Sequence, residues 1–154
     1  MGANGKIVWS GKAKEGFKLR IRQITSRSRG CHVRSVIDEL RRYVIGWINY
    51  FGISHTYKSV LELDKWLRRR VRLYYWKQWK QPRTRRRHLI ALGISSGEVK
   101  IASYSRKGYW RMSGNALVQR ALGKDWLLLQ GVPYMRSRWI AIHYGKDAMP
   151  SPVV

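Results

Sequence analysis

The sequence predicts an all-α protein in which a bundle of three helices is followed by a smaller, mostly helical basic region. The prediction rests on apolar residues that recur every three or four positions along several segments. It also rests on a hydrophobic fraction of 44%, with eight Trp and nine Tyr, because disordered basic tails lack the apolar residues that close a core. A chain of 154 residues can form one core or two small helical subdomains, but not a large multi-domain enzyme.

The N-terminal segment is expected to add little to the core. The first dozen residues hold three glycines and are typical of a frayed end or a short isolated strand, so residues 1–16 are expected to be poorly ordered. Phe17, Ile21 and Ile24 then recur at helical spacing between basic residues, which predicts a short basic helix. The Ser-Arg-Ser-Arg-Gly stretch that closes at Gly30 ends this helix.

The clearest periodicity predicts an amphipathic helix of about five turns. Its apolar stripe consists of Val33, Val36, Ile37, Leu40, Val44, Trp47, Ile48 and Phe51. Gly52 can close the helix. Gly46, in its interior, costs roughly 1 kcal/mol relative to Ala unless another backbone packs against it, so we expect a close helix crossing there.

A third helix is expected from about Tyr57 to Lys80. Its apolar stripe consists of Val60, Leu63, Leu67, Val71 and Tyr74. Stepping 100° per residue puts a basic set on the opposite side, with Trp76 and Trp79 among or beside it: Lys65, Arg68, Arg69, Arg72 and Lys80. From Lys65 to Arg87 the sequence has eleven Lys or Arg and no acid.

Shorter helices are expected in the second region. Pro82 can end one helix and open the next, which should run for three turns to Gly93. Ser95 and Glu98 match a capping box, so a further helix should reach about Tyr104, and another is expected over residues 115–129. The expected organisation is a remnant at 1–16, a helical bundle at 17–80, a helical basic region at 82–139 and a loose tail at 140–154.

Charge restricts the class of partner. Thirty-two Lys and Arg against eight Asp and Glu give a net charge of +24, whose self-repulsion favours a polyanionic partner, and nucleic acid is the first candidate. No apolar run approaches the roughly 20 residues that span a bilayer, and no signal peptide opens the chain. Cys31 is the only cysteine and the histidines are widely spread, so neither a metal nor another cofactor is expected. We expect a soluble protein of the cytoplasm or an organelle interior, without membrane association.

The acidic residues do not suit catalysis. Polymerases and many nucleases cluster carboxylates around divalent metals, whereas the close acidic pairs here, Asp38 with Glu39 and Glu62 with Asp64, lie on strongly patterned helices where salt bridges are the expected role. A recombinase-like or nuclease set could be assembled from His88, His143 and Tyr144, but a chain so rich in these residue types contains such sets by chance. No catalytic residue is therefore predicted.

The basic run predicts nucleic-acid binding more specifically. A merely solvated helix face mixes both signs of charge, whereas Lys65 to Arg87 is uniformly basic and also carries tryptophans. Arginine binds phosphate bidentately and indole rings stack on exposed bases, so the combination is typical of proteins that bind structured RNA or a single strand. For Trp76 and Trp79 core packing is an equal alternative.

Five stretches in unbroken order resemble a known family: RQITSRSRG (22–30), LRRYVIGWINYF (40–51), LDKWLRRRVR (63–72), WKQWK (76–80) and KGYWR (107–111). They look like the C-terminal part of group II intron-encoded reverse transcriptase/maturases. The resemblance runs from about Phe17 to Trp139. It implies that residues 17–80 form the family's three-helix thumb, the maturase-specific domain X, and that residues 82–139 form its DNA-binding region.

The resemblance and the basic run together suggest two sets of binding residues. The candidate RNA-binding residues are Arg27, Arg29, Arg42, Asn49, Tyr50, Lys65, Arg68, Arg69, Arg70, Arg72, Trp76, Lys77, Trp79, Lys80, Arg83, Arg85, Arg86 and Arg87. The candidate DNA-binding residues are Arg106, Lys107, Tyr109, Trp110 and Arg111. The implied partner is group II intron RNA, whose folding and splicing the thumb promotes. Target DNA and the polymerase part of the parent protein are further candidate partners.

The chain departs from the family because the acidic polymerase motif of the palm is missing. The resemblance therefore implies a non-catalytic part of a reverse transcriptase, with the chemistry belonging to the intron. The alternative function is that of a general basic nucleic-acid-binding structural protein, such as a ribosome-associated factor, and a small nuclease or recombinase is a third possibility. The order and spacing of the five stretches favour the maturase.

Overall fold

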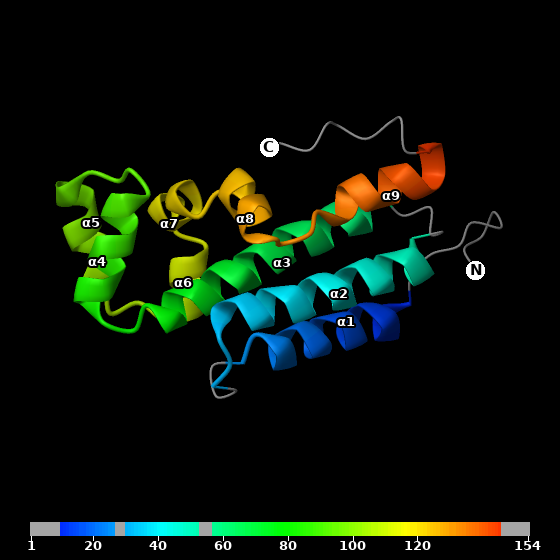
Figure 1. Cartoon of the computed structure of the whole chain (residues 1–154), viewed down its shortest axis with the longest axis horizontal. Coiled ribbons are helices and arrows are strands. Elements are labelled where there is room, and N and C mark those ends of the chain that lie inside the picture. The colour runs from blue at the N-terminus through cyan, green and yellow to red at the C-terminus, as the bar shows by residue number, and fades with distance from the viewer. Residues whose placement is uncertain (1–9, 27–29, 53–56, 146–154) are drawn as a thin grey trace.

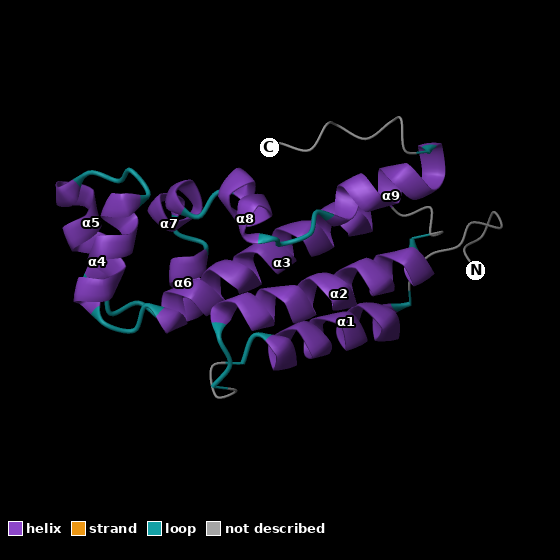
Figure 2. Cartoon of the chain, in the orientation of Figure 1, coloured by secondary structure: helices purple, strands orange, loops and turns teal. Residues whose placement is uncertain are grey.

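The computed structural model describes residues 10–26, 30–52 and 57–145, and every regular element in these ranges is a helix (Figure 2). The predicted all-α fold is confirmed. The helices are α1 (Gly11–Ile24), α2 (Val33–Phe51), α3 (Tyr57–Gln78), α4 (Pro82–Ala91), α5 (Ser96–Ser103), α6 (Tyr109–Ser113), α7 (Ala116–Ala121), α8 (Lys124–Gln130) and α9 (Met135–Tyr144). Helices α1, α2 and α3 lie lengthwise in the molecule, and α4 and α5 pair at one end (Figure 1). None of the described helices is long and apolar enough to cross a membrane.

Helix α1 begins at Gly11, earlier than the predicted start at Phe17. The Ser10 hydroxyl accepts a hydrogen bond from the Ala13 amide at 3.1 Å and caps the helix. Residues 11–16 were predicted to be poorly ordered and are helical instead, because this cap offsets the low helix propensity of the glycines. Residues 1–9 of the predicted remnant lie outside the described residues.

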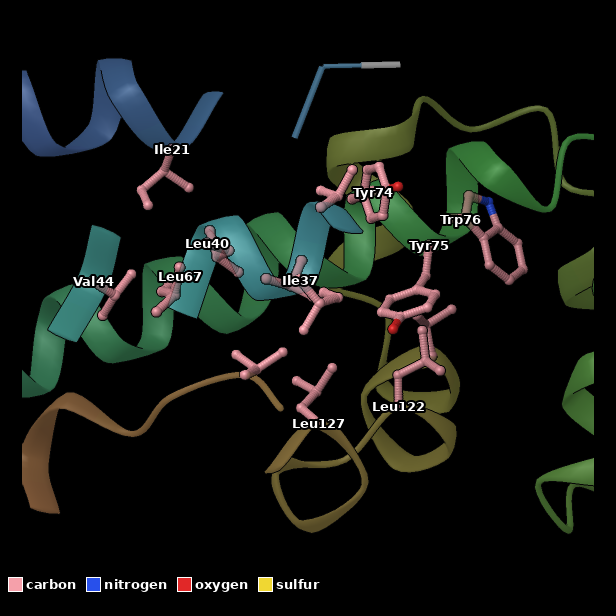
Figure 3. Close-up of a cluster of buried hydrophobic side chains, with 14 of the residues drawn as sticks. Ile21, Ile37, Leu40, Val44, Leu67, Tyr74, Tyr75, Trp76, Leu122 and Leu127 are labelled. Carbon is pink, nitrogen blue, oxygen red and sulfur yellow. The ribbon is translucent and has the colours of Figure 1, made fainter. Parts of the chain in front are cut away.

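The apolar stripes of α1, α2 and α3 meet in one core (Figure 3). The ring centroids of Phe17 in α1 and Trp47 in α2 lie 4.8 Å apart. Leu40 of α2 and Leu67 of α3 are fully buried in the same core. Burying a side chain of this size stabilises a fold by roughly 1.5 to 3 kcal/mol, which is why the apolar period located these helices so well. Helix α2 has the predicted bounds, and α3 stops just before the predicted end at Lys80.

Helix α9 returns from the far end of the chain and packs along both α2 and α3 (Figure 1). Its Trp139 ring lies 5.0 Å from the ring of Tyr57, centroid to centroid. Residues 140–144, which we predicted to belong to a loose tail, form the last turn and a half of this helix. The bundle of three helices therefore has a fourth helix, and the described residues on both sides of the predicted boundary at residue 80 share one core.

The α4–α5 hairpin follows the local sequence signals. Pro82 occupies the first turn of α4. Gly93 has a left-handed φ of +89°, and the following Ile94 amide donates to the Leu89 carbonyl at 3.1 Å, a Schellman motif that closes the helix. Ser95 occupies the N-cap position of α5, where its hydroxyl donates to a carboxylate oxygen of Glu98 at 2.8 Å and makes no hydrogen bond to a backbone amide of the helix.

The helix predicted over residues 115–129 is two helices, α7 and α8, separated at Leu122 and Gly123. A tertiary hydrogen bond lies at the interruption. The interruption leaves the Leu122 carbonyl outside a helical hydrogen bond, and this oxygen accepts a hydrogen bond from Arg72 Nε at 2.8 Å. A buried partner from another helix therefore compensates the break in this one.

The close helix crossing expected at Gly46 is absent. A Cβ atom built on Gly46 meets no atom within 4 Å, and the residue is exposed. The close approach occurs instead at Gly52, the C-cap of α2, where an added Cβ would lie 2.6 Å from Ile142 Cδ1 of α9 and would also clash with the Ile48 carbonyl. The packing of α9 against α2 therefore needs a glycine at position 52, where α2 ends, and not at position 46.

Candidate nucleic-acid interface

The uniformly basic run from Lys65 to Arg87 divides into buried and exposed arginines. Arg72 is buried and donates to the Leu122 carbonyl, so the prediction that it lies on an exposed face opposite the apolar stripe is wrong. Arg85 is also buried, and its Nη2 donates to the Trp76 carbonyl at 3.1 Å while its guanidinium lies 4.5 Å from the centroid of the Trp76 ring. Burial lowers the pKa of both guanidinium groups. Neither is available to a phosphate in this conformation.

Two tryptophans of the run belong to the core. Trp76 is 1% exposed and Trp79 is 7% exposed, so neither ring can accept a stacked base without unfolding. The imidazole of His88 stacks on Trp79 with the ring centroids 4.4 Å apart and the planes 7° from parallel. Of the two alternatives that the sequence allowed for these rings, core packing is the one observed.

The arginine triplet of α3 ties that helix to three neighbours. Arg68 lies with its guanidinium carbon 5.8 Å from the Tyr134 ring centroid, ahead of α9. Arg69 donates from Nη2 to the Trp110 carbonyl in α6 at 2.9 Å. Arg70 donates from Nε to the Thr25 hydroxyl after α1 at 3.0 Å. All three side chains are half-buried, so their first role is to hold elements together.

The remaining residues around the run vary in exposure. Lys65 and Lys80 are exposed. Lys77 is half-buried, with its Nζ 5.4 Å from the Tyr109 ring centroid. Arg27 and Arg29 were predicted from the Ser-Arg-Ser-Arg-Gly stretch and lie outside the described residues.

The exposed arginines gather on α4. Arg83, Arg86 and Arg87 are exposed and, together with Thr84 and Ile90, line an open depression of about 380 Å³. We call Arg83, Arg86 and Arg87 the α4 face. Positions three and four apart lie on one side of a helix, so these three side chains share the solvent-exposed side of α4. Within the described ranges none of the three has a hydrogen bond or an ion pair.

The acids whose ion pairs are described pair with arginines outside the α4 face. Glu39 pairs with Arg20 at 3.4 Å and Asp38 with Arg34 at 3.7 Å, which confirms the predicted salt-bridge role of that acidic pair. Glu98 of α5 pairs with Arg120 at 2.9 Å. The positive potential of α4 is therefore not cancelled by these contacts.

Asp64 has a role that the sequence analysis missed. It is 2% exposed, and its two carboxylate oxygens accept hydrogen bonds from the Met135 and Arg136 amides at 2.9 and 2.8 Å. These amides open α9, so Asp64 caps a helix that begins 71 residues later. Burial raises the pKa of Asp64 to about 6, although the two amides and the nearby Arg68 and Lys124 act in the opposite direction. The signal was present in the sequence, because Asp64 falls on the apolar stripe between Val60 and Leu67.

A second polar surface lies along α2 and α9. Asn49 of α2 is exposed and accepts a hydrogen bond from Arg138 Nε of α9 at 2.7 Å. Arg42 and Tyr50, the other predicted RNA-binding residues of α2, are exposed as well. Asn49 is thus already used within the chain, whereas Arg42 and Tyr50 face solvent.

The predicted DNA-binding residues form a basic and aromatic surface around α6. Arg106, Lys107 and Arg111 are exposed. Tyr109 is half-buried between the Lys77 amine and the Arg85 guanidinium, whereas Trp110 is 42% exposed. Helix α6 itself packs against α3 and follows the α4–α5 hairpin along the chain (Figure 1).

The nuclease-like set does not assemble. His88 stacks on Trp79 in the α4 region, whereas His143 and Tyr144 lie at the end of α9, at the other end of the molecule (Figure 1). His143 Nε2 lies 2.7 Å from the Gly52 carbonyl, and its ring stacks on Trp139. Within the described ranges no group of three or more His, Cys, Asp or Glu could hold a metal ion. These histidines have structural partners instead.

Comparison with known families identifies the domain that contains α1 to α4. Residues 14–92 match the family model described as the group II intron, maturase-specific domain. The chain belongs to this family. No curated protein sequence matches the chain significantly. The match confirms the maturase-specific part of the resemblance, which the four sequence stretches between residues 22 and 80 indicated.

The maturase-specific domain includes the arginine triplet, Asp64 and the α4 face, and it is a non-polymerase part of group II intron proteins. Helices α5 to α9 follow it, yet they are not independent of it. Asp64 and Arg69 of the domain hold α9 and α6 respectively. The maturase-specific domain and the following segment therefore present their surfaces in fixed relative positions.

Proposed function

We propose that this chain binds group II intron RNA and promotes its folding and splicing, with the α4 face as the main phosphate-binding surface. The observation that carries the proposal is that Arg83, Arg86 and Arg87 are exposed and without described partners inside the maturase-specific domain. Lys80, exposed at the start of the same segment, extends the charge. The contribution of α3 is smaller than the sequence suggested, because its arginines are engaged within the fold.

The physical basis is charge neutralisation on a rigid support. A folded RNA brings phosphates together and needs counterions, which a set of fixed guanidinium groups can replace. Helix α4 is held in place by the buried Leu89 and Arg85 on its inner side. Its outer arginines can therefore bind phosphates without first ordering the backbone, which limits the entropic cost of binding. The ribozyme then performs the chemistry, and the protein lowers its requirement for magnesium.

The test is splicing of a group II intron RNA at low magnesium with the full chain added. The variant in which Arg83, Arg86 and Arg87 are all changed to Gln should lose most of the stimulation and bind the RNA more weakly. The slope of log affinity for RNA against log salt concentration should become shallower by about two to three units, one for each phosphate that is no longer bound. Its melting temperature should stay close to that of the unchanged chain, since the replaced side chains are exposed and Gln has a similar helix propensity.

A matched control removes three exposed charges elsewhere. Lys12, Lys58 and Lys100 are exposed, and replacing them with Gln changes net charge by the same amount. This control should retain most of the affinity and of the splicing stimulation. Equal losses in the two triple variants would show that net charge alone, and not the α4 face, drives binding. An unrelated folded RNA of the same length tests for the specificity that a general basic protein lacks.

We also propose that the surface around α6 contacts nucleic acid, including the DNA target. Arg106, Lys107 and Arg111 are exposed there beside the half-buried Tyr109 and the exposed Trp110. Phosphate contacts from these side chains can position a strand without reading its sequence. The surface lies beyond the matched domain but is joined to it through Arg69.

A further inference from the structure

One exposed aromatic ring is held by a charged side chain of another helix. The Arg69 guanidinium carbon lies 4.0 Å from the centroid of the Trp110 ring, a cation–π contact that covers one face of the indole. Arg69 also donates to the Trp110 carbonyl at 2.9 Å and to the Ser113 hydroxyl at 3.3 Å. These three contacts fix both the backbone and the ring of Trp110 relative to α3.

The ring nevertheless remains accessible. Trp110 is 42% exposed although one of its faces is covered, and no other aromatic ring or cation in the described part of the chain lies against it. Trp76 and Trp79, by contrast, are core residues. An indole that is held on one face by a guanidinium and is still 42% exposed leaves part of its surface open to a ligand.

Exposed basic residues flank Trp110 in the sequence. Arg106 and Lys107 precede it, Arg111 follows it, and all three are exposed. Tyr104, at the end of α5, is a second exposed aromatic residue, at 60% exposure. The depression at the α4 face is lined by three arginines, Thr84 and Ile90, with no aromatic ring. The two surfaces therefore differ in the chemistry that they offer to a nucleic acid.

We propose that Trp110 is a stacking platform for an unpaired base, with Arg106, Lys107 and Arg111 binding the phosphates of the same strand. The inference rests on the proposed nucleic-acid contact around α6 and specifies its ligand as a single strand. In a duplex the faces of the bases are already stacked on one another, so an indole can stack only on a base that is unpaired or at an end. Arg69 is a positioning residue, because it holds the ring from behind.

The first experiment compares single strands with a duplex. Fluorescence anisotropy measures the affinity of the full chain for an unstructured RNA, an unstructured DNA of the same length, and a capped hairpin duplex. Trp110→Ala should weaken binding to at least one single strand by between about fivefold and 150-fold, the range for removing an aromatic residue from a base stack. Binding to the duplex should change by less than about twofold. The strand that is affected tells whether RNA or DNA is the source of the base.

Conservative and control variants separate stacking from folding. Trp110→Phe should retain most of the single-strand affinity, because any aromatic face stacks. Arg69→Lys keeps the charge but removes the guanidinium fork, and should weaken single-strand binding more than duplex binding. Tyr144→Ala removes an exposed aromatic residue of α9, at the other end of the molecule, and should leave both affinities unchanged. Thermal melting of each variant checks that it is folded.

Two outcomes would overturn the proposal. One is unchanged single-strand affinity in a folded Trp110→Ala variant, and the other is a loss of the same size in Trp110→Phe as in Trp110→Ala. A loss of duplex and single-strand binding together in Trp110→Ala would also count against it. A failure of the proposed α4 interface would look different. In that case the triple Gln variant of Arg83, Arg86 and Arg87 would bind intron RNA normally, whereas the Trp110 variants would still lose single-strand affinity.

Discussion

At the scale of single residues, one residue type serves opposite purposes in this chain. Arg72 is buried and donates to a carbonyl of the loop after α7, whereas Arg86, fourteen positions later, faces solvent without a described partner. Removing a buried guanidinium leaves its acceptor unpaired and costs stability, whereas an exposed arginine can become Gln with little effect on folding. The number of arginines in a basic run therefore does not give the number of nucleic-acid contacts.

Asp64 is the buried acid on which the position of α9 depends. Because burial raises its pKa from 3.8 to about 6, the folded protein holds this proton more tightly than the unfolded chain does. The stabilisation is then fully present below pH 4 and is lost as pH rises through about 6. The upper limit is about 3 kcal/mol, since each pKa unit corresponds to about 1.4 kcal/mol.

We predict that Asp64→Asn removes this pH dependence. Urea unfolding at several pH values between 4 and 7 measures the free energy of unfolding of both proteins. The unchanged protein should lose stability relative to the Asn variant as pH rises, because only its carboxyl group must ionise in a buried position. Asp125→Asn, at an exposed acid of α8, is the control that removes the same charge outside the core. If the unchanged protein instead gained stability relative to the Asn variant as pH rises, the hydrogen bonds from the Met135 and Arg136 amides would lower the pKa of Asp64 by more than burial raises it.

At the scale of elements, α2 shows how two glycines in one helix differ in function. Gly46 is exposed and has no neighbour that an added methyl group would touch. Gly52 ends the helix where Ile142 of α9 approaches, and its amide donates to the Ile48 carbonyl at 2.6 Å. Neither residue has a positive φ, so the difference lies in the atoms around the Cβ position, which are absent at Gly46 and are the Ile48 carbonyl and the Ile142 side chain at Gly52.

We predict opposite effects of adding one methyl group at these two positions. Gly46→Ala should stabilise the protein by roughly 0.5 to 1 kcal/mol, because Ala loses less backbone entropy in a helix interior. Gly52→Ala should destabilise it, because Ile142 and the end of α2 must move apart. Chemical denaturation gives both values, and each variant is the control for the other. A stabilised Gly52→Ala protein would show that α9 can shift on α2 without cost.

At the scale of the whole molecule, positively charged residues greatly outnumber acidic ones, and they are used in different ways in different places. The net charge is +24, and the described ion pairs of Asp38, Glu39 and Glu98 are formed with arginines other than those of the α4 face. Many of the remaining positive charges in the middle of the molecule hold helices together through carbonyls, hydroxyls and aromatic rings. Three exposed arginines without described partners lie together on the outside of α4, and three more exposed basic residues lie around α6.

We predict a strong dependence of RNA binding on salt. If about six phosphates are neutralised, log affinity for structured RNA should fall against log salt concentration with a slope of roughly −4 to −5. Binding to intron RNA at several salt concentrations measures this slope. A slope near zero between low and physiological salt would contradict the electrostatic interface.

We also predict that the chain does not extend a primer on an RNA template with any divalent metal ion. Polymerisation needs carboxylates close enough to share metal ions, whereas here Asp64 binds the α9 amides and Glu39 binds Arg20. A primer-extension assay with magnesium or manganese is the measurement, and a complete reverse transcriptase is the positive control. Extension that persists after further purification of the chain would contradict this prediction.

The sequence by itself determined the features that depend on neighbours along the chain. The apolar period of α2 and α3 gave their bounds closely, because an amphipathic helix must bury one stripe whatever it packs against. Pro82 and Gly93 marked the ends of α4 through their own backbone preferences. The order and spacing of five motifs were enough to indicate the family.

Only the tertiary structure decided which side chains of the basic run are free. Arg72 finds its acceptor 50 positions away and Asp64 finds its amides 71 positions away, and no local pattern encodes such partners. Trp76 and Trp79 were equally suited to a core or to a base until neighbouring helices buried them. Arg69 and Trp110 become one unit only because α6 packs on α3. A helical wheel gives the direction of a side chain from its own axis, whereas exposure depends on what the rest of the chain places there.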